Sequence, residues 1–241
     1  MEIRFRSDVS VTLLRSWGGD RDIVEDAQAR DPGTAVEEAR IAPILRALLQ
    51  RKIVHTSPFE HSGMCVHVEA PAVVWWEWTR HRFMPQSRQD HSFNLESGRY
   101  KQLRPEFYLP SEDRPVREPD GFKPMKPDLL TDPALASEVG DIQADVFADA
   151  WEAYERQLAR GVAREVARNV LGPAVYYAGR VSGGVLTWLH FLALRTRDDA
   201  ANPSSYPQWE IEQVARKCED VLAGLFPQTV GAWREFGRRA P

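Results

Sequence analysis

The sequence predicts an α+β fold in a single domain spanning residues 1–241. Segments with the apolar spacing of helices outnumber those that alternate with the two-residue period of strands. The two kinds do not follow one another as βαβ units require, and we find neither an internal repeat nor a linker. With 43% hydrophobic and 27% charged residues, the composition is ordinary for a globular domain of this length.

The N-terminal part is expected to form one strand and two helices. Alternation at Val9, Val11 and Leu13 favours a strand, and residues 20–30 have the pattern of a short helix. A longer helix is predicted over residues 34–52, because a capping box precedes an apolar stripe. The capping pair is Thr34 and Glu37, and the stripe is Ile41, Ile44, Leu45, Leu48 and Leu49.

The middle of the chain combines a strand, a tryptophan-rich helix and long polar stretches. Strict alternation over residues 63–69 predicts a half-buried strand. A helix over residues 72–82 follows Pro71 and ends in Arg80-His81-Arg82. The segments after it are expected to be irregular over residues 83–104, a short strand over 107–109 and a loop or extended arm over the proline-rich stretch 114–133.

The C-terminal part is predicted to be mostly helical. A long helix over residues 134–160 is indicated by apolar residues every four positions, and Gly161 ends it. These apolar residues are Ile142, Val146, Ala150, Tyr154 and Leu158. Further helices are expected over residues 162–171, 185–195, 208–225 and 229–238, with a strand over 175–181.

Composition argues against several classes of protein. The net charge of −4 is not that of a general nucleic-acid binder, and no stretch approaches the ~18 apolar residues that span a bilayer. A soluble cytoplasmic protein with no membrane contact is expected. Cys65 and Cys218 are predicted to be buried thiols rather than a disulfide, and no metal is expected because His55, Glu60 and His61 match no zinc spacing.

Two polar segments have the character of an anion site. A helix C-terminus accounts for one cation, but three consecutive basic residues at 80–82 point in directions about 100° apart. Residues 94–99 offer short polar side chains, a glycine and an arginine, which suit an anion held by side-chain and backbone donors.

These segments resemble the motifs of the flavin-dependent thymidylate synthases, the ThyX family. In that family Arg-His-Arg is followed by a serine-containing run ending in Ser-x-Arg-Tyr, as in Ser97-Gly98-Arg99-Tyr100 here. The resemblance covers roughly residues 57–211, with all motifs in order. The other matching segments are Ser57-Pro58-Phe59-Glu60-His61, Phe107-Tyr108-Leu109-Pro110, residues 164–171, and residues 191–195 followed by 208–211.

The resemblance implies a central antiparallel sheet wrapped by helices, and methylation of C5 in a uridine nucleotide. FAD would be the cofactor and in reduced form the hydride donor, with methylenetetrahydrofolate as carbon donor and NADPH as a further co-substrate. No enzyme nucleophile is needed for this route. A homotetramer with active sites shared between subunits is also implied.

The resemblance further implies roles for individual residues. Arg195 would polarise the uracil ring and favour its ionisation at N3, and Ser97 is the second predicted catalytic residue. An arginine suits that task because it stays protonated opposite a developing oxyanion. The predicted flavin contacts are Ser57, Arg80, His81, Arg82, Asn94 and His190. The predicted nucleotide contacts are Glu77, Trp78, Arg80, Glu96, Ser97, Gly98, Arg99, Arg168 and Arg195.

Four departures from the family pattern leave the substrate open. They fit either drift in a divergent homologue or a pocket that admits a 2′-hydroxyl, as in the UMP/dUMP-methylating relatives of nucleoside-antibiotic pathways such as that of polyoxin. An ordinary dUMP-specific thymidylate synthase and a flavoprotein that binds nucleotide without methylating it are the alternatives. The departures are the insertion at 85–90, Leu95 followed by a displaced Glu96, Gly184-Val185-Leu186 in place of Asn-x-Arg, and a longer loop at 201–207 with Tyr206 where histidine is common.

Overall fold

The computed structural model describes residues 2–28, 36–50, 55–80, 91–124, 126–199, 201 and 204–239. The chain divides into two compact units, each assembled from three separate segments. The first unit comprises Met1–Val9, Glu69–Arg80 and Leu95–Gly179. The second comprises Ser10–Val68, His81–Asn94 and Arg180–Pro241.

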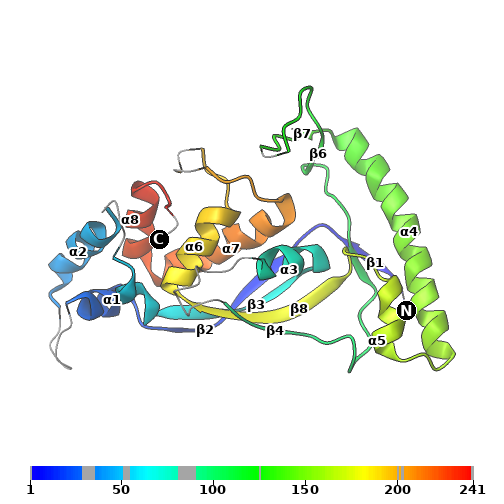
Figure 1. Cartoon of the computed structure of the whole chain (residues 1–241), viewed down its shortest axis with the longest axis horizontal. Coiled ribbons are helices and arrows are strands. Elements are labelled where there is room, and N and C mark those ends of the chain that lie inside the picture. The colour runs from blue at the N-terminus through cyan, green and yellow to red at the C-terminus, as the bar shows by residue number, and fades with distance from the viewer. Residues whose placement is uncertain are drawn as a thin grey trace. The chain divides into compact units, whose positions relative to one another are not determined.

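A four-stranded sheet has the strand order β2-β3-β8-β4 (Figure 1), and β3, β4 and β8 each contribute residues to both units. Gly63 at the start of β3 lies against Gly183 near the end of β8, so closely that the position has no room for a side chain. This pairing of a strand start with a strand end makes β3 and β8 antiparallel and confirms the predicted α+β class with an antiparallel sheet. The strands are β2 (Ser10–Trp17), β3 (Gly63–Pro71), β4 (Ser92–Leu95) and β8 (Tyr176–Gly184).

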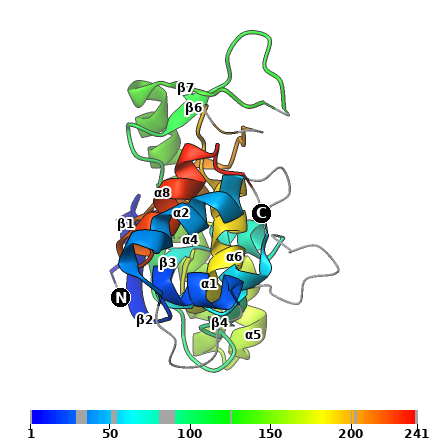
Figure 2. The same cartoon turned by 90° about the vertical axis from the view of Figure 1, so that its left-hand side faces the viewer.

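Helices supply the rest of the second unit. α7 packs against α6, α8 and β2, while α2 packs against α1 and α8 (Figures 1 and 2). Large side chains such as Trp188, Trp233 and Phe191 are fully buried among these elements. The bounds are α1 (Asp20–Ala27), α2 (Glu38–Gln50), η1 (Ser57–Glu60), α6 (Val185–Arg195), α7 (Trp209–Leu225) and α8 (Pro227–Glu235).

The predicted capping box of α2 is wrong. The helix begins at Glu38, so Glu37 lies before it and cannot be its third residue, and Thr34 lies outside the described residues. The start of α2 is instead tied to α1. The guanidinium of Arg21 donates to the Val36 carbonyl and, at 2.6 Å, to the Glu38 carboxylate. The negative charge of Glu38, in the first turn, also interacts favourably with the positive end of the helix dipole.

The first unit is organised around one long helix, α4. β1 pairs in parallel with β5, and the β6–β7 hairpin and α5 lie beside opposite ends of α4 (Figure 1). Asp132 caps α4 by accepting the Leu135 N–H at 3.0 Å, and Gly161 with φ +79° follows its end. The bounds are β1 (Arg4–Arg6), α3 (Ala72–Thr79), β5 (Glu106–Tyr108), β6 (Pro115–Arg117), β7 (Leu130–Thr131), α4 (Pro133–Ala159), α5 (Arg164–Ala167) and η2 (Arg168–Val170).

The apolar stripe predicted for α4 lies partly on the wrong face. Ile142 and Val146 are 59% and 58% exposed. The helix packs through Tyr154 and Leu158, which the stripe included, and through Phe147 and Trp151, which it missed. The Phe147 ring stacks on Phe107 at 5.2 Å. Spacings of three and four residues both occur on a helix surface, so a four-residue period can select the wrong stripe.

Among the described residues, no helix is long and apolar enough to cross a membrane.

Other segments differ in length or type from those predicted. A strand, β4, lies within the stretch expected to be irregular, and the proline-rich arm contains the β6–β7 hairpin. α3 ends at Thr79, and residues 162–171 contain a single α-helical turn followed by a 3₁₀ turn. The prediction for α6 is confirmed at both ends. Cys65 and Cys218 are buried free thiols, as expected.

Candidate functional site

The loop at residues 96–101, in the first unit, is fastened to β8 by Glu96. The Glu96 N–H donates to the Ala178 carbonyl at 2.9 Å, and the Ala178 N–H donates to the Glu96 carboxylate at 3.1 Å. The other carboxylate oxygen pairs with Lys101 at 2.5 Å, and the side chain is only 9% exposed. The predicted nucleotide contact Glu96 therefore anchors both ends of this loop.

Ser97 and Gly98 form the turn at the start of the loop. The Ser97 carbonyl accepts the N–H groups of Tyr100 and Lys101, and its hydroxyl accepts the Arg99 N–H at 3.3 Å. A Cβ atom on Gly98 would meet the Cδ atom of Arg168 at 3.2 Å. The structure therefore brings together Ser97, Gly98, Arg99 and Arg168, four of the predicted nucleotide contacts.

Arginines from α5 and η2 gather beside this loop. Arg99 pairs with Glu165 at 2.6 Å, and Arg164 donates to the Tyr100 carbonyl at 3.2 Å. Arg168 is half-buried, and in the described part of the chain no carboxylate lies within 4 Å of its guanidinium. A positive group so placed is available to a phosphate or carboxylate, which guanidinium binds with two parallel hydrogen bonds.

Tyr177, on β8, shows how the local charges are arranged. Burial raises the pKa of its hydroxyl, the positive charge of Arg168 opposes that rise, and the negative charge of Glu96 adds to it. The Tyr177 ring thus lies in the field of both residues. A neutral phenol here can donate a hydrogen bond without adding negative charge next to a bound anion.

A network of ion pairs links Glu96, at the start of the 96–101 loop, to neighbouring strands. Arg104 lies 3.1 Å from Glu69 and 4.0 Å from Glu96, while Arg6 pairs with Glu106 at 3.0 Å and with Glu69 at 3.4 Å. Burial alone would raise the pKa of the Glu69 carboxyl, but Arg104 and Arg6 outweigh it and lower the pKa. Glu69 is therefore ionised at neutral pH and holds two arginines in place.

The predicted contacts on α3 differ in exposure. Arg80 follows the helix with its side chain 75% exposed and pairs with Glu77 at 3.2 Å. Trp78 is fully buried and stacks on Trp75 at 5.8 Å, which is a core position. Trp76, which the sequence analysis did not select, is the tryptophan of this helix that is largely exposed, at 58%.

The second unit carries three of the predicted flavin contacts, each on a different element: Ser57, Asn94 and His190. Ser57 is exposed at the start of η1, Asn94 is exposed on β4, and His190 is half-buried on α6. η1 packs against α6. The predicted contacts His81 and Arg82 lie outside the described residues, as does the insertion at 85–90.

Arg195 is the last residue of α6 and is half-buried. One of its Nη atoms donates to the Leu194 carbonyl at 3.5 Å. The next residue, Thr196, is 1% exposed and bonds to Arg238, a buried arginine that the sequence analysis did not select. The two are 42 residues apart, so no local pattern could have linked them.

The remaining departures from the family pattern have structural roles in the second unit. Gly184 is the N-cap of α6, and Val185 and Leu186 are buried at 0% and 1%, so these positions present no polar side chain. Tyr206 lies under the guanidinium of Arg197, 5.3 Å from the ring centre. His91, which the sequence analysis missed, packs edge-on against Trp188 at 4.3 Å and joins the start of β4 to α6.

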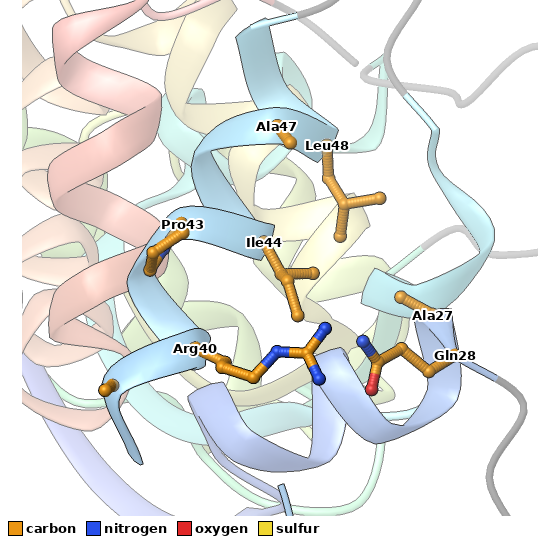
Figure 3. Close-up of a pocket in the computed structure, with 8 residues that line it drawn as sticks. Ala27, Gln28, Arg40, Pro43, Ile44, Ala47 and Leu48 are labelled. Atoms are coloured by element: carbon orange, nitrogen blue, oxygen red, sulfur yellow. The ribbon is translucent and has the colours of Figure 1, made fainter. Parts of the chain in front are cut away.

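A groove of about 390 Å³ lies between α1 and α2 (Figure 3). Pro43, Ile44 and Leu48 line it with apolar surface, and the Arg40 and Gln28 side chains lie at one end. None of its described lining residues is a predicted site residue.

Comparison with known proteins gives consistent matches over the whole chain. A family model described as thymidylate synthase complementing protein matches residues 12–228. Flavin-dependent thymidylate synthases of Streptomyces avermitilis and Streptomyces coelicolor are 36% and 35% identical to the chain. The alignments cover 98% and 100% of this chain and 95% and 96% of those relatives.

Solved structures match equally well. The UMP/dUMP methylase PolB from Streptomyces cacaoi, bound with 5-Br UMP, superposes with a TM-score of 0.89 at 33% identity and covers 99% of each chain. The same protein bound with 5-Br dUMP gives a TM-score of 0.89 at 32% identity, covering 99% of this chain and 100% of that one.

Proposed function

The chain belongs to the family of flavin-dependent thymidylate synthases, and from this premise we propose that it methylates C5 of both dUMP and UMP. It is an enzyme of the methyltransferase type. The observation that carries the choice of substrate is its similarity, over 99% of the chain, to a methylase bound with analogues of both nucleotides. Methylenetetrahydrofolate is the proposed carbon donor and NADPH a further co-substrate.

We assign the nucleotide phosphate to the loop at 96–101 and Arg168. The Ser97 hydroxyl, the backbone around Gly98 and the half-buried Arg168 guanidinium supply donors on adjacent positions. A dianionic phosphate favours such a cluster. Glu96 holds the loop on β8, since both of its carboxylate oxygens have partners within the protein. Its proposed role is therefore positioning, and the 2′-hydroxyl need not contact it.

The residues assigned to the flavin have the chemistry that FAD requires. Ser57, Asn94 and His190 offer hydroxyl, amide and imidazole groups, and all three are exposed or half-buried. Pyrophosphate and flavin-ring oxygens need such donors, so these residues fit the group. Arg80, also largely exposed, is the fourth described residue assigned to it. When bound and reduced, the flavin supplies the hydride that completes the methyl group.

We assign the activation of uracil to Arg195. C5 of uracil is a poor nucleophile, and drawing charge onto the ring carbonyls requires a fixed positive donor. Arg195 stays protonated at any physiological pH and ends the well-packed helix α6. Ser97 is the second residue proposed to act on the nucleotide.

The proposal is tested by incubating the protein with reduced FAD, methylenetetrahydrofolate and equal amounts of UMP and dUMP. We expect both to gain a C5 methyl group, with kcat/KM values within about 100-fold, because pockets discriminate weakly against an added hydroxyl. Exclusive use of dUMP would identify an ordinary thymidylate synthase. FAD binding without any methylated product would identify a flavoprotein that only binds nucleotide.

A homotetramer with shared active sites is also proposed, from family membership. Light scattering coupled to size-exclusion chromatography tests it. A protein that remains active at the mass of one chain, 27.5 kDa, would contradict shared sites.

A further inference from the structure

A buried arginine, Arg238, joins three parts of the second unit. Its Nη1 and Nη2 atoms donate to the two carboxylate oxygens of Glu219, on α7, at 2.8 and 2.5 Å. Nη2 also donates to the Thr196 hydroxyl at 2.6 Å. The guanidinium lies over the Trp233 ring, 4.6 Å from its centre, and its Nε is 3.6 Å from Asp198. The whole residue is 8% exposed.

The backbone turn that delivers this side chain is unusual. Arg238 has φ +51° and follows Gly237 at φ +83°. A non-glycine residue in this region costs roughly 1–2 kcal/mol, so the surroundings must hold it there. Trp233 does so at both ends: its carbonyl accepts the Arg238 N–H at 3.0 Å, and its indole donates to the Arg239 carbonyl at 2.8 Å.

Thr196 connects Arg238 to the end of α6. Its hydroxyl donates to the Leu192 carbonyl at 2.6 Å while accepting from Arg238, and it directly follows Arg195. The helix C-terminus carries partial negative charge, so a buried cation there is favourable. The last turn of α6 is thereby fixed through one hydroxyl to a charged group on another element.

The residues on either side of Arg195 are held as well. The Ser205 hydroxyl donates to the Leu194 carbonyl at 2.6 Å, and the Arg197 N–H donates to the Glu212 carboxylate at 3.1 Å. Glu212 lies on α7, as Glu219 does. The chain before and after Arg195 is therefore fixed at Leu194, Thr196 and Arg197, of which Arg197 bonds directly to α7.

Stability alone does not explain why these charges are buried. Desolvation of a buried ion pair often cancels its attraction, and well-packed apolar residues can be as stable. What the ionic cluster adds is fixed geometry, since bidentate and hydroxyl contacts define distances and angles. Catalytic groups need that precision, because a displacement of about 1 Å can cost about 100-fold in rate.

We propose that Arg238 is a positioning residue for Arg195, acting through the hydroxyl of Thr196 and anchored by Glu219. This inference rests on the proposed function, in which Arg195 stabilises charge on the uracil ring. Arg238 touches neither substrate nor cofactor in this role. It sets where the end of α6 presents Arg195.

The test compares Thr196→Val with Thr196→Ser, assayed by release of tritium from C5-labelled dUMP. Valine keeps the shape but removes the hydroxyl, and we expect kcat to fall at least about tenfold with KM for the nucleotide within about twofold. Serine keeps the hydroxyl and should restore kcat. Arg238→Lys keeps the charge but loses the bidentate fork, so it should also lower kcat.

Arg234→Ala is the matched control. Arg234 also donates to Glu219, at 2.7 Å, but among the described residues none of its hydrogen bonds or ion pairs reaches α6, and its side chain is 45% exposed. We expect its kcat to stay within about twofold of wild type, with a Tm decrease similar to that of Thr196→Val.

The outcomes distinguish a failure of the positioning role of Arg238 from a failure of the proposed function. Wild-type kcat in Thr196→Val and Arg238→Lys, with lowered Tm, would overturn the positioning role and leave the proposed function intact. Equal losses in the valine and serine variants would also overturn it, because the hydroxyl would then be irrelevant. A wild-type protein that releases no tritium from either nucleotide would overturn both.

Discussion

The side chain of Arg168 crosses Gly98 so closely that a methyl group on Gly98 would meet the Arg168 Cδ atom at 3.2 Å and two Leu103 side-chain atoms at 3.3 Å. Ordinary contacts between carbon atoms are about 3.5–4.0 Å. Gly98 is thus the position at which a single added carbon would displace the arginine proposed to hold the nucleotide phosphate.

Gly98→Ala should therefore raise KM for the nucleotide by about tenfold, because charged hydrogen bonds are worth about 1.5–3 kcal/mol and a displaced Arg168 loses part of that. Steady-state kinetics with dUMP measures it. Gly140→Ala is the control: Gly140 lies in α4 with no atom within 4 Å of the added carbon, and alanine should stabilise that helix by up to ~1 kcal/mol. An unchanged KM in Gly98→Ala would remove Arg168 from the phosphate site.

Arg168→Ala should weaken binding of UMP by about 10–100-fold, as expected for the loss of charge-assisted hydrogen bonds. Calorimetric titration with UMP and with uridine distinguishes a phosphate contact from a general one. The variant should bind uridine as the wild type does, whereas UMP should lose affinity. Arg160→Ala, an exposed arginine that follows α4, should change neither. Equal losses for UMP and uridine would place Arg168 at the base or sugar.

Arg195→Ala should lower kcat by about 100–1,000-fold while the protein stays folded, the usual cost of one donor to a developing oxyanion. Tritium release from C5-labelled nucleotide under saturating substrate measures the chemical step. Arg197→Ala, two residues on and with its side chain 41% exposed, serves as the neighbouring control and should retain turnover. Near-normal turnover in folded Arg195→Ala would remove it from the mechanism.

The helix that the sequence predicted best is apolar on nearly every side. α6 was predicted at Val185–Arg195 because apolar side chains surround it, and eight of its residues are buried. β4 was missed because it is an edge strand of four residues, too short for its polar-apolar alternation to stand out, and its apolar Leu95 is exposed. In α4, local spacing identified a helix but could not tell which stripe meets the core.

In the candidate site, the sequence could identify only those residues that a family motif marks. The structure places Arg168 beside Gly98, 70 positions earlier in the chain, and the family motif had marked both. The cluster of Arg238, Glu219 and Thr196 had no motif to mark it. Its members face one another only after α6, α7 and the turn beyond α8 have packed, so their partnership depends on tertiary structure.

Cys65→Ala and Cys218→Ala should both retain kcat within about threefold, because the proposed route needs no covalent enzyme thiol. Both thiols are buried, and burial raises the pKa of Cys218 well above its ordinary value, so it stays neutral and is a poor nucleophile. Each variant should lose about 1 kcal/mol of stability from the small cavity. A loss of tritium release in either variant, with FAD binding unchanged and no larger loss of stability than this, would favour a cysteine mechanism.

The last prediction concerns pH and Glu219. Burial alone would raise the pKa of its carboxyl, but Arg238 and Arg234 outweigh burial and lower the pKa below the ordinary value of 4.5. A group whose pKa is lower in the folded state stabilises the fold above its unfolded-state pKa, and that contribution is lost as pH falls through the folded-state pKa. The wild-type protein should therefore lose the stabilisation from ionised Glu219 on acidification below about pH 4.5. The charged groups around the carboxyl are Arg238 and Arg234, which donate to it, and Asp198, which lies beside Arg238.

Glu219→Gln isolates this contribution, because glutamine keeps the shape but cannot ionise. At pH 7 the variant should be less stable by about 3 kcal/mol, since it leaves the buried Arg238 without its carboxylate partner. Urea unfolding at pH 7 and at about pH 3.5 should show the gap between wild type and variant narrowing on acidification. Glu235→Gln is the control: Glu235 is 46% exposed and pairs with Arg46 at the surface, where such pairs contribute about 0–1 kcal/mol. A gap for Glu219→Gln that stays constant between the two pH values would mean that the carboxyl does not ionise against Arg238, and the anchor proposed for the end of α6 would be lost.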